Sequence, residues 1–239
     1  SLILLQSKSM PKRFIIIWLS LFFLAMLAYG FPDSPAPWFD EGLNLGIAKA
    51  AALHGVWSLQ IGPSDFVTER SLLITTNYPA LGFVALAFRW FGASLAAAKV
   101  VMSIFLALFV WLFYRLAKTY YGDRAAIWSL ALLVTFLPLY GNGKAVLGEI
   151  PGLVYLFGAI LLFERRRPWS FILSGVLFGL AAATKPLYLL VLPSLGVGLV
   201  WECWRERRLP WRQALLLAAG AVIPLIILVA TLLPNQVTP

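Results

Sequence analysis

Two adjacent carboxylates, Asp40 and Glu41, stand in the stretch PAPWFDEG (residues 35–42), after an apolar run and before a short amphipathic segment. A carboxylate held at the start of a helix can take a proton as a general base or bind a divalent metal. A structural role fits the pattern equally well: Asp40 caps a helix that runs to His54, while Glu41 favours the positive N-terminal end. The two roles are compatible, because capping fixes a side chain as catalysis requires.

A third carboxylate, Glu149, precedes an apolar run that continues to residue 163. A span that began at Ile150 would be short, so a helix of normal membrane length draws Glu149 into the outer margin of the bilayer. Carboxylates at that depth are costly and usually functional. The alternative is an acidic first helical turn with Pro151 near its start.

Three basic side chains are candidates for binding a phosphate. Lys185 lies in a tight turn between two apolar runs, close to a hydrocarbon boundary, which suits a lipid phosphate. The alternative is a lysine that ends a helix with its stem along apolar surface. Lys144 and Arg70 are weaker versions of the same arrangement. The single histidine, His54, has no second histidine or cysteine at ligand spacing, so a zinc site is not expected.

Composition places these residues in a membrane. Of the 239 residues, 61% are hydrophobic and 12% charged, and the mean hydropathy is +0.86, whereas about a quarter of residues are charged in soluble domains. The net charge of +9 is spread over short basic clusters between apolar runs, where topology determinants belong. We therefore expect an integral membrane protein that does not bind nucleic acid.

Basic clusters predict the topology. If all of them face the cytoplasm, an even number of crossings separates successive clusters. Three apolar runs lie between the first two clusters, and the middle one, residues 78–91, is short enough to be an interfacial helix, with Asn77 as its cap and Pro79 in its first turn. The clusters are Lys8, Lys12 and Arg13; Arg115, Lys118 and Arg124; Arg165, Arg166 and Arg167; and Arg205, Arg207, Arg208 and Arg212.

We therefore expect an all-α, polytopic membrane protein with about seven transmembrane helices and interfacial helices in a long first extracytoplasmic loop, about residues 32–94. It would form a single transmembrane domain, residues 1–239, in the plasma (inner) membrane with a cytoplasmic N-terminus. Since proline opposes a continuous helix, the long run at 169–201 should fold at Thr184-Lys185-Pro186 into two crossings. The expected crossings are residues 14–31, 93–114, 125–140, 145–163, the two halves of 169–201, and 214–233.

The order of these features resembles the GT-C superfamily of membrane glycosyltransferases, especially its protein O-mannosyltransferase and lipid A aminoarabinosyl transferase branch. The order comprises a signal-anchor span, an outer Asp-Glu pair, a short run led by Asn-Tyr-Pro, a span into YGDR (residues 121–124), an outer acidic residue and ATKP (residues 183–186). The resemblance covers about residues 11–233 and corresponds to the N-terminal seven-helix module of such enzymes. It implies that a C-terminal portion is lacking.

The resemblance implies an inverting transfer of a sugar from a polyprenyl phosphate to a hydroxyl of a lipid, glycan or protein at the extracytoplasmic face. Asp40 matches the family's catalytic base or substrate-positioning residue, and Glu41 is its motif partner. Glu149 falls where the family often has an aspartate, and Lys185 matches the lysine after the fifth span. Lys144 and Arg70 are further candidates for the donor phosphate.

The cofactor and the protein class both have alternatives. The reaction needs either no cofactor or a divalent metal, Mg²⁺ or Mn²⁺, held by Asp40 and Glu149. A non-catalytic membrane protein is the competing class: a transporter of lipids or lipid-linked sugars, or the scaffold of a truncated transferase. Transporters commonly place ionisable residues at mid-bilayer in broken helices. The candidate charges here cluster at the outer margin, which favours surface chemistry.

Overall fold

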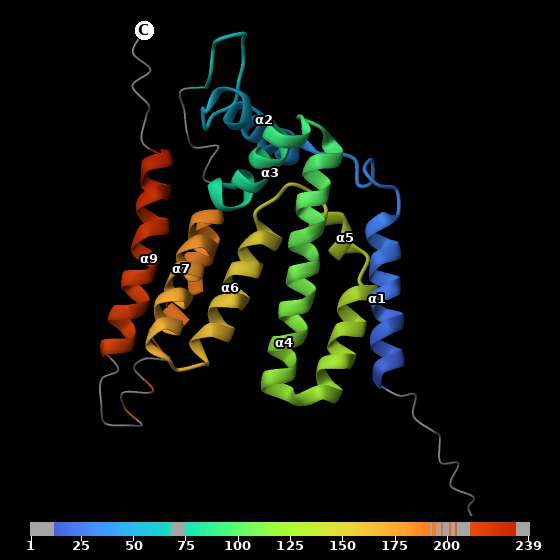
Figure 1. The fold of residues 1–239 in the computed structure, drawn as a ribbon, viewed down its shortest axis with the longest axis vertical. Helices are drawn as coiled ribbons and strands as arrows, with labels where there is room; N and C mark the ends of the chain where they lie inside the picture. Colours follow the sequence, from blue (N-terminus) through green and yellow to red (C-terminus); the bar gives the residue numbers. More distant parts are fainter. Residues whose placement is uncertain are drawn as a thin grey trace, which may run out of the picture.

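The computed structural model describes residues 12–67, 75–191, 193, 194, 197, 201, 204 and 211–232, and over these residues the protein is helical apart from its connections (Figure 1). Two of the described helices, α4 (Leu95–Thr135) and α9 (Trp211–Leu232), have the length and apolar composition needed to cross a membrane. The predicted all-α membrane fold is confirmed. The count of seven spans stays a prediction.

Helix α4 consists of two arms that meet at Gly122. This glycine has φ 79° and ψ 173°, a conformation that glycine adopts without the steric cost of a side chain. The second arm runs back beside the first, and α1 (Lys12–Ala28) packs against the pair (Figure 1). The arms correspond to the crossings predicted at 93–114 and 125–140.

The prediction that the second of these crossings reaches residue 140 is wrong. The arm ends at Thr135, and the short helix α5 (Pro138–Gly143) follows. Pro138 has no N–H to donate to the carbonyl of Val134, as a continuing helix would require. The hydroxyl of Tyr140 donates to that carbonyl instead, at 2.7 Å.

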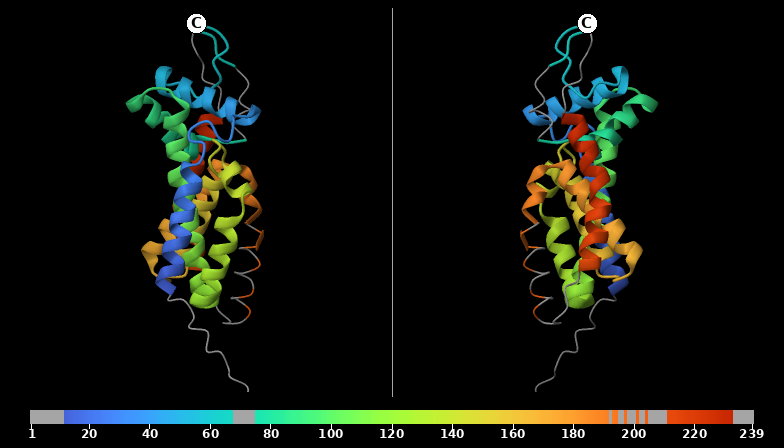
Figure 2. Two further views of the ribbon diagram at one scale, coloured as in Figure 1. Left: turned by 90° about the vertical axis from the view of Figure 1, so that its right-hand side faces the viewer. Right: turned by 90° about the vertical axis from the view of Figure 1, so that its left-hand side faces the viewer.

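Two helices cover one end of the bundle. Helix α2 (Phe39–His54) ends where predicted, but Trp38 is its N-cap residue and no side chain caps it. The prediction that Asp40 caps this helix is therefore wrong, because Asp40 already lies in the first turn. Helix α3 (Tyr78–Phe91) has the predicted bounds and cap, since Asn77 Oδ1 accepts from Tyr78 N at 2.6 Å. Figures 1 and 2 show α3 beside α2 at the same end.

The second half of the chain forms a layer of α6 (Glu149–Phe163), α7 (Pro168–Thr184) and α9. The crossing expected from residue 145 begins only at Glu149, because residues 144–148 are not helical. Helix α7 ends at Thr184, as predicted from Pro186, and the 3-10 helix η2 (Pro186–Leu190) follows. The crossing expected after η2 falls largely outside the described residues.

Basic segments gather at the end of the bundle opposite α2 and α3 (Figure 1). At the kink of α4, Asp123 pairs with Lys12 from α1 at 3.4 Å and with Lys118 at 2.9 Å. Nearby, Tyr120 donates to Glu164, the residue after α6, at 2.7 Å. The described residues of the predicted basic clusters thus share one end of the bundle, while Lys8, Arg205, Arg207 and Arg208 lie outside the described residues. The side of the membrane that this end faces stays a prediction.

Helices α7 and α9 approach so closely that their backbones touch at glycines. A Cβ atom on Gly175 would lie 2.0 Å from the carbonyl oxygen of Leu217, and one on Gly220 would lie 2.0 Å from that of Ile172. Small residues allow this approach between membrane helices, whose association depends on van der Waals packing.

Replacing Gly220 with alanine should force α7 and α9 apart. Overpacking of this kind costs about 1–3 kcal/mol, so the unfolding temperature in detergent should fall, as differential scanning fluorimetry would measure. The control is Gly141→Ala in α5, where an added Cβ has no neighbour within 4 Å. Equal unfolding temperatures for the two variants would contradict this packing.

Candidate active site

The segment of residues 144–148 joins α5 to α6 and is buried. It lies below the helices that cover the outer end of the bundle, where we use "outer end" for the end that carries α2 and α3 (Figure 1). Two clusters of polar side chains flank the segment. The first cluster contacts Val146, and the second begins at Glu149.

The first cluster contains a buried ion pair between Glu41 of α2 and Lys99 of α4. Glu41 Oε1 accepts from Lys99 Nζ at 2.8 Å and from the backbone N–H of Val146 at 3.0 Å. Both side chains are 0% exposed. Lys99 Nζ also donates to the carbonyl of Pro35 at 3.3 Å, and Asn44 Nδ2 donates to the carbonyl of Val146 at 2.7 Å. These contacts tie α2 to α4 and to the 144–148 segment.

The Glu41 carboxylate is enclosed by other parts of the chain. One of its carboxylate oxygens is engaged by Lys99 and Val146, and the other, Oε2, is buried and has no hydrogen-bond partner among the described residues. A general base must reach the substrate proton directly or through one water. Its neighbour Asp40 is half-buried, and the Asp40 carboxylate makes no hydrogen bond or ion pair within the described part of the chain.

Lys144 is a buried cation without a carboxylate partner among the residues that the structure describes. Its Nζ donates to the carbonyl of Tyr29, beyond the end of α1, at 3.0 Å. Burial, and then repulsion from Lys99, lower the pKa of Lys144. Both effects disfavour the charged form of Lys144, and an anion bound beside its ammonium group would favour that form again.

The second cluster joins Glu149, at the start of α6, to Lys185, directly after α7. Lys185 Nζ donates to Glu149 Oε1, and the hydroxyl of Tyr188 donates to the backbone carbonyl of Glu149. The Lys185 side chain is 26% exposed and that of Glu149 is 43% exposed, so solvent and ligands can reach both. The second oxygen of Glu149, Oε2, is buried and has no partner within the described ranges.

Helix α3 begins beside this second cluster. The backbone N–H of Asn77 donates to the carbonyl of Thr184 at 3.1 Å, and the hydroxyl of Tyr155 on α6 donates to the carbonyl of Pro79 at 2.7 Å. Tyr78 reaches α9, where its hydroxyl donates to the carbonyl of Pro224 at 3.0 Å. The ends of α3, α6 and α7 are therefore fixed around Glu149 and Lys185.

The structure brings together some of the predicted site residues. Glu149 and Lys185 are in contact, and Glu41 contacts the segment that carries Lys144. Asp40 lies at the same outer end on α2, but the described contacts do not join it to Glu149. Arg70 lies outside the described residues, so its predicted binding of the donor phosphate stays a prediction.

Lys99 is a site residue that the sequence prediction missed. Its partner, Glu41, is 58 residues away, so no local pattern links them. A signal was nevertheless present: Lys99 interrupts an otherwise apolar predicted span at 93–114. An ionisable residue inside a span needs a partner and usually has a function.

The described residues offer no group of three or more His, Cys, Asp and Glu side chains that could surround a metal ion. Glu149 is already neutralised by Lys185. Asp40 and Glu149 thus form an incomplete ligand set, their metal role stays a prediction, and no step below uses a metal.

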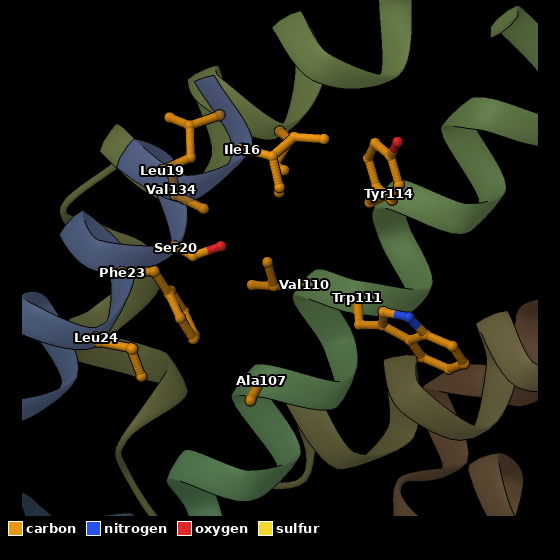
Figure 3. A pocket seen from close by; sticks show the side chains of 11 residues that line it. Ile16, Leu19, Ser20, Phe23, Leu24, Ala107, Val110, Trp111, Tyr114 and Val134 are labelled. Carbon is orange, nitrogen blue, oxygen red and sulfur yellow. The ribbon is translucent and has the colours of Figure 1, made fainter. Parts of the chain in front are cut away.

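A separate cavity of about 420 Å³ lies between α1 and the two arms of α4, and Figure 3 shows side chains from these helices around it. Its lining is apolar except for Ser20 and Tyr114, and it includes Phe23, Val110 and Trp111. A lining without carboxylate or lysine suits hydrocarbon rather than sugar.

The all-α membrane fold, with the ion pairs Glu41–Lys99 and Glu149–Lys185 at its outer end, fits the GT-C type of membrane glycosyltransferase that the sequence resembles. A family model described as dolichyl-phosphate-mannose-protein mannosyltransferase matches residues 79–232, more than half of the chain. The chain belongs to this family, and the resemblance seen in the sequence is confirmed. The match includes Lys99, Glu149 and Lys185 and begins after Asp40. No curated protein and no solved structure matches the chain.

The ion pair of Glu41 and Lys99 gives a test of the fold at the site. Replacing Glu41 with glutamine leaves a buried ammonium without a counter-charge, and breaking such a pair costs about 3–5 kcal/mol. The unfolding temperature of Glu41→Gln should therefore fall strongly, and the double variant Glu41→Gln/Lys99→Met should recover most of the loss.

Asp123→Asn is the matched control for this test, because it breaks ion pairs whose side chains are 40–65% exposed and such pairs contribute little. An unchanged unfolding temperature for Glu41→Gln would show that the pair is not buried as described.

Proposed function

We propose that this membrane glycosyltransferase moves a sugar from a polyprenyl phosphate to an acceptor hydroxyl at the extracytoplasmic membrane face, with inversion at the anomeric carbon. The observation that carries the proposal is the contact of Glu149 with Lys185, which places a reachable carboxylate and a cation from two helices at one end of the bundle. Family membership supports sugar transfer. The acceptor is a lipid, a glycan or a protein.

Asp40 acts as the general base in this proposal. Its carboxylate takes the proton of the acceptor hydroxyl while the hydroxyl oxygen attacks the anomeric carbon. The bond from that carbon to the phosphate oxygen breaks on the opposite side, and its electron pair leaves with the polyprenyl phosphate. The supporting observations are that Asp40 is half-buried and that no described side chain occupies its carboxylate.

The leaving phosphate needs a cation, because negative charge develops on its oxygen as the bond breaks. Lys185 is the first choice, since it is partly exposed beside a hydrocarbon boundary and Glu149 holds its ammonium in place. Lys144 is the second, because its buried charge has no described counter-ion. Glu149 would then orient the acceptor or the donor through its partly exposed carboxylate.

The orientation in the membrane follows from the basic segments in this proposal. They gather at the end opposite α2 and α3 (Figure 1), and cytoplasmic loops are enriched in lysine and arginine. The N-terminus would then be cytoplasmic and the two polar clusters would face outward across the plasma membrane.

Asp40→Asn tests the base assignment. Loss of a general base costs about 10²-fold or more in rate, so transfer from a radiolabelled polyprenyl-phosphate sugar in proteoliposomes should fall by at least that factor. Asp33→Asn is the control, because Asp33 is an exposed carboxylate shortly before α2 and should keep the wild-type rate.

A rate near that of wild type for Asp40→Asn would refute the base assignment. Movement of the labelled donor across the bilayer without cleavage of its sugar phosphate bond would favour the alternative, a transporter of lipid-linked sugars.

Lys185→Met tests the phosphate assignment. A hydrogen bond to a charged group contributes about 1.5–3 kcal/mol, so the KM for the donor should rise about 10- to 100-fold. Lys49→Met removes an exposed lysine of α2 and controls for the general loss of positive charge. An unchanged donor KM in Lys185→Met, measured by initial rates, would move the phosphate site to Lys144 or Arg70.

A further inference from the structure

We infer that Lys99 is a positioning residue for sugar transfer: it binds the Pro35 carbonyl before Asp40 and the Glu41 carboxylate after it. Through Glu41 it also ties the first turn of α2, which carries Asp40, to the segment carrying Lys144. The inference rests on the proposed function, in which Asp40 is the base. Lys99 itself is fully buried and touches no substrate.

The first support is where the two bonds of Lys99 fall along the chain. Its Nζ donates to the carbonyl of Pro35 at 3.3 Å and to Glu41 Oε1 at 2.8 Å. Asp40 lies between these two acceptors, next to Glu41. One ammonium group therefore fixes both the chain that enters α2 and the first turn that carries Asp40.

The second support is the bond of α2 to Val146. The backbone N–H of Val146 donates to Glu41 Oε1 at 3.0 Å, and its carbonyl accepts from Asn44 Nδ2 at 2.7 Å. Both backbone groups of this residue are thus held by side chains of α2. Val146 lies between Lys144 and Glu149 in a buried segment, so the contacts of α2 also set the position of the other site residues.

The third support is the cost of burying the pair. Apolar residues of similar volume often stabilise a fold as well as a buried ion pair, or better. Stability alone therefore does not call for a lysine in a helix that is otherwise apolar around it. A lysine provides several directed N–H donors, and the two that are engaged here reach the two sides of Asp40.

Precise placement has a measurable kinetic value, because a shift of about 1 Å in a reacting group can cost 10²-fold in rate. In Glu41→Gln/Lys99→Met no charge is buried, and the carbonyl oxygen of the introduced glutamine can still accept from the N–H of Val146. This double variant should keep an unfolding temperature near that of wild type. Its kcat should nevertheless fall about 10- to 100-fold, because Pro35 loses its donor and the turn that carries Asp40 is no longer tied to α4.

The test is a cycle of four proteins in proteoliposomes with a radiolabelled polyprenyl-phosphate sugar: wild type, Asp40→Asn, the double variant and their combination. If the Glu41–Lys99 pair acts through Asp40, the double substitution should lower kcat when Asp40 is present. It should change kcat little when Asp40 is already replaced by asparagine. A merely structural role predicts the same loss in both backgrounds.

Two kinetic results would overturn the inference. The first is a wild-type kcat in the double variant. The second is a kcat of the combined variant that falls by the product of the two separate factors, that of the double variant and that of Asp40→Asn. If the double variant does not fold, Lys99→Arg keeps the charge and the donors while changing their reach, and it should fold with a reduced kcat. A wild-type kcat for Lys99→Arg would overturn the inference, as would failure of both variants to fold. A wild-type rate for Asp40→Asn would instead refute the proposed function.

Discussion

A buried ion pair between Glu41 and Lys99 is the contact on which the outer end of this protein depends. Neither side chain is exposed, and each would be costly to bury alone. Hydrogen bonds to Pro35 and Val146 complete the pair. One interaction therefore joins the entry to α2, the first arm of α4 and the segment that leads into α6.

In the second polar cluster, too, residues distant in sequence hold the ends of helices together. Lys185 follows α7 and bonds to Glu149 at the start of α6, while Asn77 at the start of α3 bonds to the last residue of α7, Thr184. Helix ends carry backbone groups without intrahelical partners, and here these ends converge. These contacts fix the ends of α3, α6 and α7 relative to one another.

The sequence predicted correctly the helix ends that depend on neighbouring residues, such as a capping side chain or a proline. The cap and bounds of α3 followed from Asn77 and Pro79, and the end of α7 followed from Pro186. The fold class followed from hydropathy, because long apolar runs have few other solutions.

What the sequence did not predict depends on contacts between distant residues. Glu41 and Lys99 are 58 residues apart, so no local pattern pairs them, although Lys99 stands out as a charged residue in an apolar predicted span. Residues 145–148 were expected to belong to a span because their hydropathy does not distinguish a buried connection from a helix. The capping role expected for Asp40 is wrong because the N-cap of α2 is Trp38, two residues before Asp40.

The most direct measurement of the central claim is photo-crosslinking with a polyprenyl phosphate that carries a diazirine next to its phosphate. In native membranes, peptide mapping should find the label in the 144–148 segment and around Lys185. Label confined to the opposite end, near Gly122 and residues 164–167, would contradict the account, because the donor would then bind away from both polar clusters.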